Sequence, residues 1–244
     1  MIDRYFSGIL ELHNLVKDRE HGAMKEAADQ VAKAIEAGKI IHLFGCGHSH
    51  ILTEEVFYRA GGLVPIHPIF HEPLMLHEGA VTSSSLERKN DYALTFMEEV
   101  DIEPGDVMIV LSTSGRNPVP ADVALIAKQK GAFVIGITSL TYSKSQPSRH
   151  NEGYHLYNAV DLVIDNHAPK GDALLSDDAV DVPFAPTSTV IGATILNAIL
   201  AEAVGIMAAN GFEPPIFLSG NIDGSDERNN ALIEKYKARI PLLS

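Results

Sequence analysis

Small polar residues gather at three places along the chain, and each place has the composition of an anion-binding turn. The first is GCGHS (45–49), the second is STSGRN (112–117) and the third is TST (187–189). Each precedes a stretch with helical periodicity, where free backbone N–H groups and side-chain hydroxyls can hold a phosphate. The candidate ligand-binding residues are Gly45, Gly47, Ser49, Ser112, Thr113, Ser114, Arg116, Asn117, Thr187, Ser188 and Thr189.

The first cluster does not fit the common nucleotide-binding loops. A dinucleotide loop needs G-x-G-x-x-G, but His50 stands where the third glycine belongs. The chain contains neither G-x-x-x-x-G-K-[ST] nor G-x-S-x-G, which excludes a P-loop and a nucleophile elbow. Cys46, His48 and His50 keep metal binding open as an alternative, although no other Cys or His stands at a recognisable ligand spacing. A tight strand-to-helix turn with Cys46 packed inside explains the same residues without any ligand.

Proton-transfer chemistry at such a site needs carboxylates or histidines nearby. The stretch HEPLMLHEGA (71–80) follows a predicted strand and supplies His77 and Glu78, which makes Glu78 the first candidate catalytic base. Glu55, in the helix after the first cluster, and Glu202, inside an otherwise apolar helix, are further candidates. A solvent-facing position explains Glu55 equally well. Glu202 must point into the site or lie at a subunit interface, because burying a lone carboxylate is costly.

A metal site is the alternative interpretation of DNHAPKGDALL (165–175). His167 and Asp172 have suitable side chains for a divalent cation. However, the turn-forming Pro169 and Gly171 explain the composition without one. We therefore expect no metal and no cofactor.

The composition limits the classes of partner. The chain has 244 residues, of which 45% are hydrophobic and 21% charged, and a net charge of −13. An acidic chain repels nucleic acid and anionic membranes, so we expect neither as a partner. Cys46 is the only cysteine, the N-terminus does not have the pattern of a signal peptide, and no apolar run is long enough to span a membrane. These features predict a cytoplasmic protein.

Apolar runs alternate with helical periods from residue 39 onward. Short buried strands that alternate with helices predict a parallel sheet covered on both faces. Because proline cannot donate a backbone hydrogen bond to a neighbouring strand, Pro65 and Pro68 predict that the second strand, 63–70, lies at an edge of the sheet. The carboxyl ends of the strands would bring the polar clusters together. Strands are predicted at 39–45, 63–70, 104–113, 132–139 and 159–166, and helices at 49–60, 91–98, 120–130, 189–210 and 226–239.

Two helices precede the first strand, with a break near Gly22 and an end at Gly38. We expect residues 1–38 to pack on residues 39–244 as one globular unit, because no linker, repeat or low-complexity tract divides the chain. The segments 140–158 and 166–187 are interpreted as long loops, which are often functional in such sheets.

Taken together, the motifs G-x-G-x-S (45–49), S-x-S-G-x-N (112–117) and T-S-T (187–189) resemble the sugar isomerase (SIS) domain over residues 38–210. The resemblance implies a flavodoxin-like three-layer αβα sandwich with a mostly parallel sheet. It also implies a phosphosugar ligand contacted by Ser49, Ser112, Ser114 and Thr189. The segment S-G-R-N-P (114–118) is similar to one in N-acetylmuramic acid 6-phosphate etherases, as is the E-G-A that begins at Glu78.

The resemblance implies a phosphosugar-binding protein, and an aldose–ketose isomerase is the function expected first. A phosphosugar etherase or lyase, an amino-sugar-phosphate deaminase and a non-catalytic phosphosugar sensor stay open. The helix 189–210 is apolar on nearly every face, so the N-terminal helices or another subunit must cover it. SIS domains form oligomers, and we expect a homodimer in which His21 reaches a neighbour's site.

Overall fold

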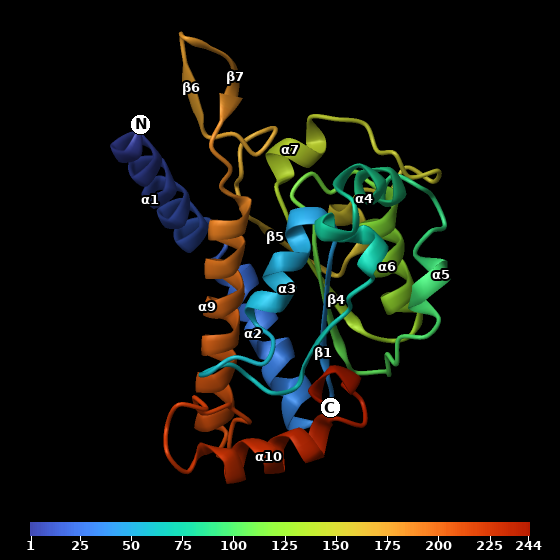
Figure 1. The fold of residues 1–244 in the computed structure, drawn as a ribbon, viewed down its shortest axis with the longest axis vertical. Helices are drawn as coiled ribbons and strands as arrows, with labels where there is room; N and C mark the ends of the chain where they lie inside the picture. Colours follow the sequence, from blue (N-terminus) through green and yellow to red (C-terminus); the bar gives the residue numbers. More distant parts are fainter.

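A central sheet of five parallel strands organises the molecule (Figure 1). The computed structural model describes all 244 residues. The strand order is β2-β1-β3-β4-β5, and the sheet has helices on both faces, which confirms the α/β sandwich expected from the sequence. The strands are β1 (Ile41–Gly45), β2 (Ile66–Pro68), β3 (Val107–Leu111), β4 (Phe133–Thr138) and β5 (Leu162–Asp165).

Alternate residues of each strand point to opposite faces and enter two separate cores. In β1, Ile41 and Leu43 belong to one core, whereas Phe44 belongs to the other. In β3, Ile109 and Val110 divide in the same way. Because both faces are covered, every residue of β1 and β3 is buried. β3 is a continuous apolar run, whereas β1 includes the buried His42.

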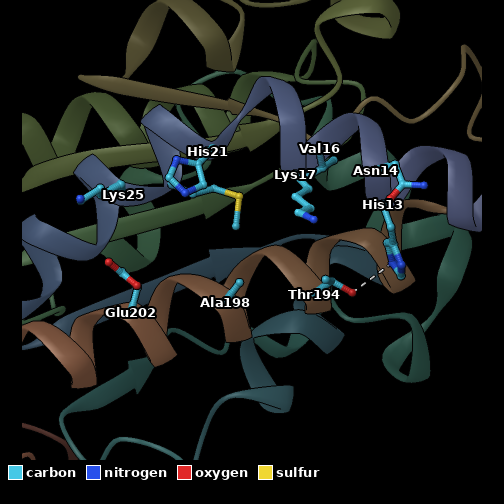
Figure 2. A pocket seen from close by; sticks show the side chains of 10 residues that line it. His13, Asn14, Val16, Lys17, His21, Lys25, Thr194, Ala198 and Glu202 are labelled. Carbon is cyan, nitrogen blue, oxygen red and sulfur yellow. Dashed lines mark hydrogen bonds between the residues drawn. The ribbon is translucent and has the colours of Figure 1, made fainter.

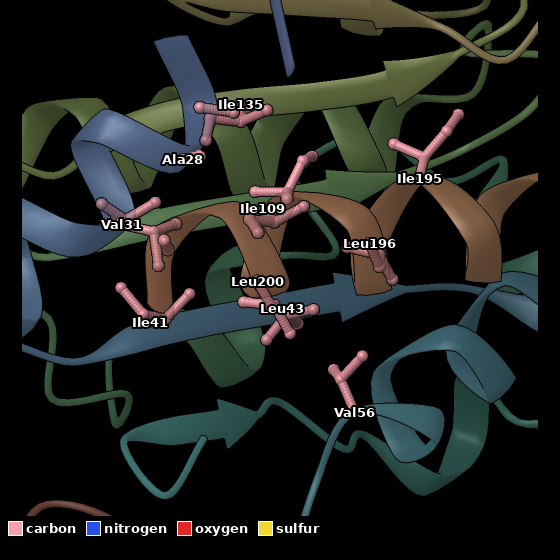
Figure 3. Close-up of a cluster of buried hydrophobic side chains, with 14 of the residues drawn as sticks. Ala28, Val31, Ile41, Leu43, Val56, Ile109, Ile135, Ile195, Leu196 and Leu200 are labelled. Carbon is pink, nitrogen blue, oxygen red and sulfur yellow. The ribbon is translucent and has the colours of Figure 1, made fainter. Parts of the chain in front are cut away.

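The first face is covered by α2 (His21–Glu36), α3 (Ile51–Glu55) and the long α9 (Ser188–Ala209) (Figures 1 and 3). The helix α1 (Ile2–Arg19) packs outside them. By length and composition α9 could cross a membrane, but eight of its residues are buried here against α2 and the sheet. In this fold α9 is a core helix.

The second face is covered by shorter helices around a separate core. They are α4 (Ala80–Glu87), α5 (Leu94–Met97), α6 (Pro118–Gln129) and α8 (Leu156–Ala159). The helix α7 (Leu140–Lys144) follows β4 at the carboxyl edge of the sheet. The helix α4 and the end of α6 that begins at Pro118 lie near this same edge (Figure 1).

The two ends of the sandwich carry different additions. At the amino edge, α10 (Ser225–Tyr236) and the 3-10 turn Pro241–Leu243 close a small apolar cluster. At the other end, a hairpin of β6 (Leu175–Asp177) and β7 (Val180–Phe184) projects beside α1 (Figure 1). Arg4 Nη2 donates a hydrogen bond to the Ser176 carbonyl of β6 at 2.7 Å, and the Tyr5 hydroxyl donates one to the Pro186 carbonyl just after β7 at 2.8 Å, which ties α1 to this hairpin.

Several sequence expectations differ from the structure. The helix expected at 49–60 is a 3-10 turn, Gly47–His50, followed by the short α3, and the chain turns at Tyr58 with a φ of 44°. The second strand lies at the edge as expected but is only three residues long, because prolines limit its hydrogen bonding. The expected loop 166–187 contains the hairpin, and the expected loop 140–158 contains α7 and the start of α8. The helix α4 was not predicted.

Candidate functional site

The strand order reverses between β1 and β3, and we term the region outside the carboxyl ends of these two strands the crevice. In open parallel sheets, ligands bind outside the carboxyl ends of the strands where the strand order reverses. Here this switch point lies between β1 and β3, and Gly45 is paired with Leu111 at the ends of these strands. The first two polar clusters therefore begin side by side.

The first loop turns so tightly that only glycine fits at its start. A Cβ on Gly45 would lie 2.6 Å from the backbone carbonyl carbon of Ser49, and Gly47 has a φ of +54°. The Ser49 amide donates to the Cys46 carbonyl at 2.9 Å, which closes the 3-10 turn. The Ser49 side chain stays half-buried at the rim of the crevice.

The cysteine and histidines of this loop do not face one another as a ligand set. Cys46 is buried, and burial, followed by the charge of Glu87, raises the pKa of its thiol well above the usual range. A thiolate ligand is therefore disfavoured. His50 turns inward, where its Nδ1 contacts the Gly47 carbonyl, whereas His48 is exposed.

The second loop is held by its own Ser112 hydroxyl and by hydroxyl groups at the end of β4 and in α7. The Gly115 amide donates to Ser112 Oγ at 3.2 Å, and Ser143 Oγ donates to the Ser114 carbonyl at 2.7 Å. Thr138 Oγ1 also donates to the Thr113 carbonyl at 3.3 Å. Thr113 and Ser114 remain half-buried, so their side chains stay available at the crevice.

The third cluster differs from the first two, because a carboxylate already occupies it. Asp172 Oδ1 accepts hydrogen bonds from the Thr187 and Ser188 amides at 2.9 Å each. The two hydroxyls donate to the same carboxylate, at 3.0 Å from Thr187 and 2.6 Å from Ser188. An acid at this position stabilises the start of α9. Of the three predicted residues, Thr189 alone makes no bond to Asp172.

The two weaker metal candidates have separate partners. Asp172 caps α9, whereas His167 Nε2 lies 3.0 Å from Glu20 Oε1 and its Nδ1 lies 3.5 Å from Asp165 Oδ2. The structure therefore gives His167 and Asp172 different roles in holding the loop after β5.

The loop that carries Glu78 lies next to the first loop. Leu76 is the nearest side chain to a Cβ placed on Gly47, at 3.8 Å, and the rings of His50 and His77 are 6.4 Å apart. Glu78 itself is exposed, and its Oε1 lies 3.7 Å from His77 Nε2. The structure therefore places the loop of His77 and Glu78 beside the first loop, with the His77 ring near that of His50.

The other two carboxylates lie elsewhere. Glu55 pairs with Arg59 and accepts a hydrogen bond from Asn197 of α9 at 3.5 Å. Glu202 stands on α9, about 20 Å along the helix from its first residue. It faces a groove of about 410 Å³ that His21 and Lys25 also line (Figure 2). The structure does not bring Glu202 to the crevice.

Three arginines converge beside the second loop, and only one of them was predicted. The Arg149 amide donates to the Arg116 carbonyl at 2.9 Å. Burial, and then the charges of Arg116 and Arg88, lower the pKa of the Arg149 guanidinium, which shows that the three groups are close. Ion pairs hold four other arginines, Arg4, Arg59, Arg228 and Arg239, but none of these three. An acidic chain thus concentrates unpaired positive charge at this edge.

Asn117, at the end of the second loop, interacts with both Arg149 and Glu87. Asn117 is buried, and its Oδ1 accepts a hydrogen bond from Arg149 Nη1 at 2.8 Å. Burial raises the pKa of the Glu87 carboxyl above its usual range, and interactions with Asn117, Arg88 and Arg149 only partly offset this. Neither Glu87 nor Arg149 was predicted, since no local motif marks them. The only feature of the sequence that pointed to Arg149 was its position in the segment 140–158, which was interpreted as a long loop.

Comparisons with known proteins agree with this architecture. A model of the SIS domain matches residues 4–139. A UPF0309 protein of Halalkalibacterium halodurans is 67% identical over 244 residues, covering 100% of this chain and 98% of that protein. A UPF0309 protein of Caldanaerobacter subterraneus is 41% identical, covering 98% of this chain and 99% of that one.

Solved structures share the fold at low identity. A phosphoheptose isomerase of Francisella tularensis has a TM-score of 0.54 at 15% identity, covering 83% of this chain and 95% of its own. The Vibrio vulnificus NanR protein complexed with ManNAc-6P has a TM-score of 0.50 at 15% identity, covering 99% of this chain and 69% of its own. The family model spans more than half of the chain, and the relatives align over nearly all of it. With its sheet, its switch point and these relatives, this chain belongs to the SIS domain family and to the UPF0309 group within it.

Proposed function

We propose that this protein binds a sugar phosphate at the carboxyl edge between β1 and β3 and interconverts its aldose and ketose forms. The observation that carries the proposal is the pair of hydroxyl-bearing loops at the switch point, next to three unpaired arginines. Phosphates are held by such hydroxyls, backbone amides and guanidinium groups. Solved structures of similar fold include phosphoheptose isomerases and a protein that holds ManNAc-6P, which supports this ligand class.

The proposed roles follow the two loops. Ser112, Thr113 and Ser114 bind the phosphate, and Arg116 supplies positive charge to it. The glycines Gly45 and Gly47 let the backbone approach the sugar, where Ser49 contacts it. Glu78, assisted by His77, takes the proton from the sugar carbon that the enediol intermediate requires. This chemistry moves protons only, so it needs no cofactor.

An etherase, lyase or deaminase is the second candidate, favoured by the S-G-R-N-P segment at 114–118. Incubation with a panel of sugar 6-phosphates separates the candidates. Interconversion of aldose and ketose supports the isomerase, whereas release of lactate or ammonium supports the second candidate. Binding without turnover indicates a sensor, and binding of none of the panel contradicts the whole proposal. Phosphorylated sugars are anions that do not cross membranes, which is why we place this activity in the cytoplasm.

We also propose that the protein forms a homodimer through α1 and α9. Phe6, Leu10, His13 and Lys17 follow one another at helical spacing on one face of α1, and the two apolar side chains are 65% and 60% exposed. His13 and Lys17 line the groove between α1 and α9, together with Glu202 on the opposite wall (Figure 2). An apolar stripe that continues into a groove with charges of both signs suits a second copy of the same surface. His21 lies in this groove, which supports the expectation that it approaches a neighbouring subunit.

A further inference from the structure

A second pocket lies beside the edge strand β2, between the end of α5 and the C-terminal segment that follows α10. Its volume is about 350 Å³, and apolar side chains form much of its wall. None of its lining residues belongs to the three polar clusters or to the 3-10 turn that carries Glu78. The proposed function therefore does not use this pocket. Its polar lining includes His67, Glu99, Asp101 and Arg239.

A buried chain of hydrogen bonds leads from Asp106 to the His67 ring in this pocket. Asp106 accepts from five donors, among them His42 Nε2 at 3.1 Å and Arg239 Nη2 at 2.8 Å, so its carboxyl group is ionised. Because Arg239 supplies the paired charge, the fully buried His42 stays neutral and holds its single proton on Nε2. His42 Nδ1 is then an acceptor, and His67 Nδ1, 3.0 Å away, donates to it.

The other ring nitrogen of His67 is a free acceptor. On an imidazole ring Nε2 points away from Nδ1, so the edge of His67 that faces the pocket carries Nε2. Burial, and next the charges of His42 and Arg239, keep the pKa of His67 at about 4, so the ring does not take up a second proton at pH 7. The pocket thus presents an imidazole nitrogen that binds a hydrogen-bond donor.

The charges around the pocket favour a positively charged donor. Arg239 is the cation among the lining residues, and its guanidinium is engaged by Asp101 at 3.1 Å and Asp106 at 2.8 Å. With Glu99, three carboxylates stand against this one guanidinium. An anion would meet unpaired negative charge here, whereas a cation is attracted. Apolar side chains beside these charges suit a hydrocarbon group, and they include Ile69, Phe70, Phe96, Val100 and Leu242.

We propose that this pocket binds an organic cation, an ammonium group that carries an apolar body. The ammonium group donates a hydrogen bond to His67 Nε2 and lies near the carboxylates of Glu99 and Asp101. Its apolar body packs on Phe70 and Phe96. Charge-assisted hydrogen bonds of this kind are stronger than neutral ones. The site lies apart from the crevice and does not depend on the proposed function.

Benzylamine, which is an ammonium ion at pH 7, is the probe, and benzyl alcohol is its uncharged control of the same size. The ring nitrogens of His67 are followed by NMR in the full chain labelled with ¹⁵N. In the protein alone we expect a proton on Nδ1 and none on Nε2. Benzylamine should shift the Nε2 resonance in a saturable way. It should bind at least ~10-fold more tightly than benzyl alcohol, because a charged donor makes the stronger hydrogen bond.

Variants of two adjacent glutamates test whether the charge at the pocket matters. Glu99→Gln should weaken benzylamine binding about two- to fivefold, as the loss of one exposed charge near the ammonium group does. Glu98→Gln is the matched control, because Glu98 is also exposed but does not line the pocket, and it should bind like the wild type.

His67→Phe tests the acceptor itself, because it keeps an aromatic ring and removes both nitrogens. It should weaken benzylamine binding at least ~10-fold. The comparison of Glu99→Gln with Glu98→Gln carries the test if His67→Phe does not fold.

Equal affinity for benzylamine and benzyl alcohol would overturn the proposal, because the pocket would then recognise only the apolar ring. A proton on His67 Nε2 in the protein alone would overturn it as well. The same conclusion would follow from a His67 resonance that benzylamine does not shift, or from equal affinities of Glu99→Gln and Glu98→Gln.

Discussion

Gly115 occupies a position in the second loop where only glycine fits. It has a φ of +57°, and an added Cβ would lie 2.7 Å from both Thr138 Oγ1 and Ser143 Oγ. These two hydroxyls hold the carbonyl groups of Thr113 and Ser114. The shape of the second loop thus depends on the absence of a side chain at one residue.

Gly115→Ala should lower the free energy of unfolding by about 2–4 kcal/mol, from the left-handed conformation and the overpacking together. Gly153→Ala is the matched control, because Gly153 has a φ of +79° with nothing within 4 Å of its Cβ position. It should lose only about 1 kcal/mol. Urea unfolding measures both, and equal losses would show that Thr138 and Ser143 do not confine Gly115.

The site could be predicted from the sequence only where its residues are neighbours in the chain. Each cluster of glycines and hydroxyl-bearing residues lies within six consecutive positions, so it can be recognised in the sequence alone. Glu87, Asn117 and Arg149 meet across gaps of about 30 residues, so no spacing rule could join them. Conversely, the cluster at 187–189 had the right composition, but the sequence could not show that Asp172 reaches Thr187 and Ser188.

At the scale of elements, the buried strands were predictable because burial on both faces demands continuous apolar residues. β3 follows this rule throughout, and β1 and β4 follow it apart from one polar residue each, His42 and Thr138. β5 is buried only at Ile164 and Asp165. The hairpin of β6 and β7 was missed, because β7 is exposed except at its last residue and carries no apolar run. Its position depends on contacts with α1, which are far away in the sequence.

A buried polar network joins the amino ends of β1 and β3 to the C-terminal segment. Asp106 is fully buried and accepts hydrogen bonds from His42 Nε2 at 3.1 Å and from Arg239 Nη2 at 2.8 Å. His42 Nδ1 in turn lies 3.0 Å from His67 Nδ1, so His67 donates there when His42 Nε2 donates to Asp106. Burial, followed by the charges of His42 and Arg239, lowers the pKa of His67 to about 4.

This network predicts a loss of stability in mild acid. In the unfolded chain His67 binds its proton near its ordinary pKa of 6.5, whereas in the folded chain it does so only at about 4. Between these values the unfolded state binds more protons, so the free energy of unfolding falls as the pH falls from 6.5 to 4 and the loss levels off below. The contribution of His67 is at most about 3 kcal/mol.

His67→Gln should remove this part of the pH dependence. Urea unfolding at pH 7 and pH 4.5 should show a difference smaller by about 2 kcal/mol in the variant than in the wild type. His48→Gln, at an exposed position, controls for the general effect of losing a histidine and should keep the wild-type difference. An unchanged difference in His67→Gln would contradict the neutral state assigned to His67.

At the scale of the whole molecule, α9 is the element whose cover is incomplete. It packs on α2 and the sheet, yet only 44% of its most apolar window is buried. The sequence predicted that the N-terminal helices or another subunit must cover α9, and α1 and α2 supply part of this cover. The exposed stripe on α1, which contains Phe6 and Leu10, lies next to the part of α9 that remains uncovered.

Light scattering at micromolar concentration should therefore give twice the chain mass of 26.4 kDa. Leu10→Glu, on the exposed face of α1, should yield a monomer, because a buried charge opposes association. Leu94→Glu changes an exposed leucine of α5, away from this face, and should leave the dimer intact. A wild-type monomer with full ligand affinity would refute both the dimer and a shared site.

The binding of a sugar phosphate between β1 and β3 is the central claim, and thermal unfolding with matched ligands tests it most directly. A ligand that binds only the folded state raises the melting temperature by mass action. A sugar 6-phosphate should raise it in the wild type, whereas the same sugar without phosphate should not. Ser114→Ala should weaken the shift while the variant without ligand melts close to the wild type. Equal shifts from both sugars, or an undiminished shift in Ser114→Ala, would contradict the assignment of the phosphate to this crevice.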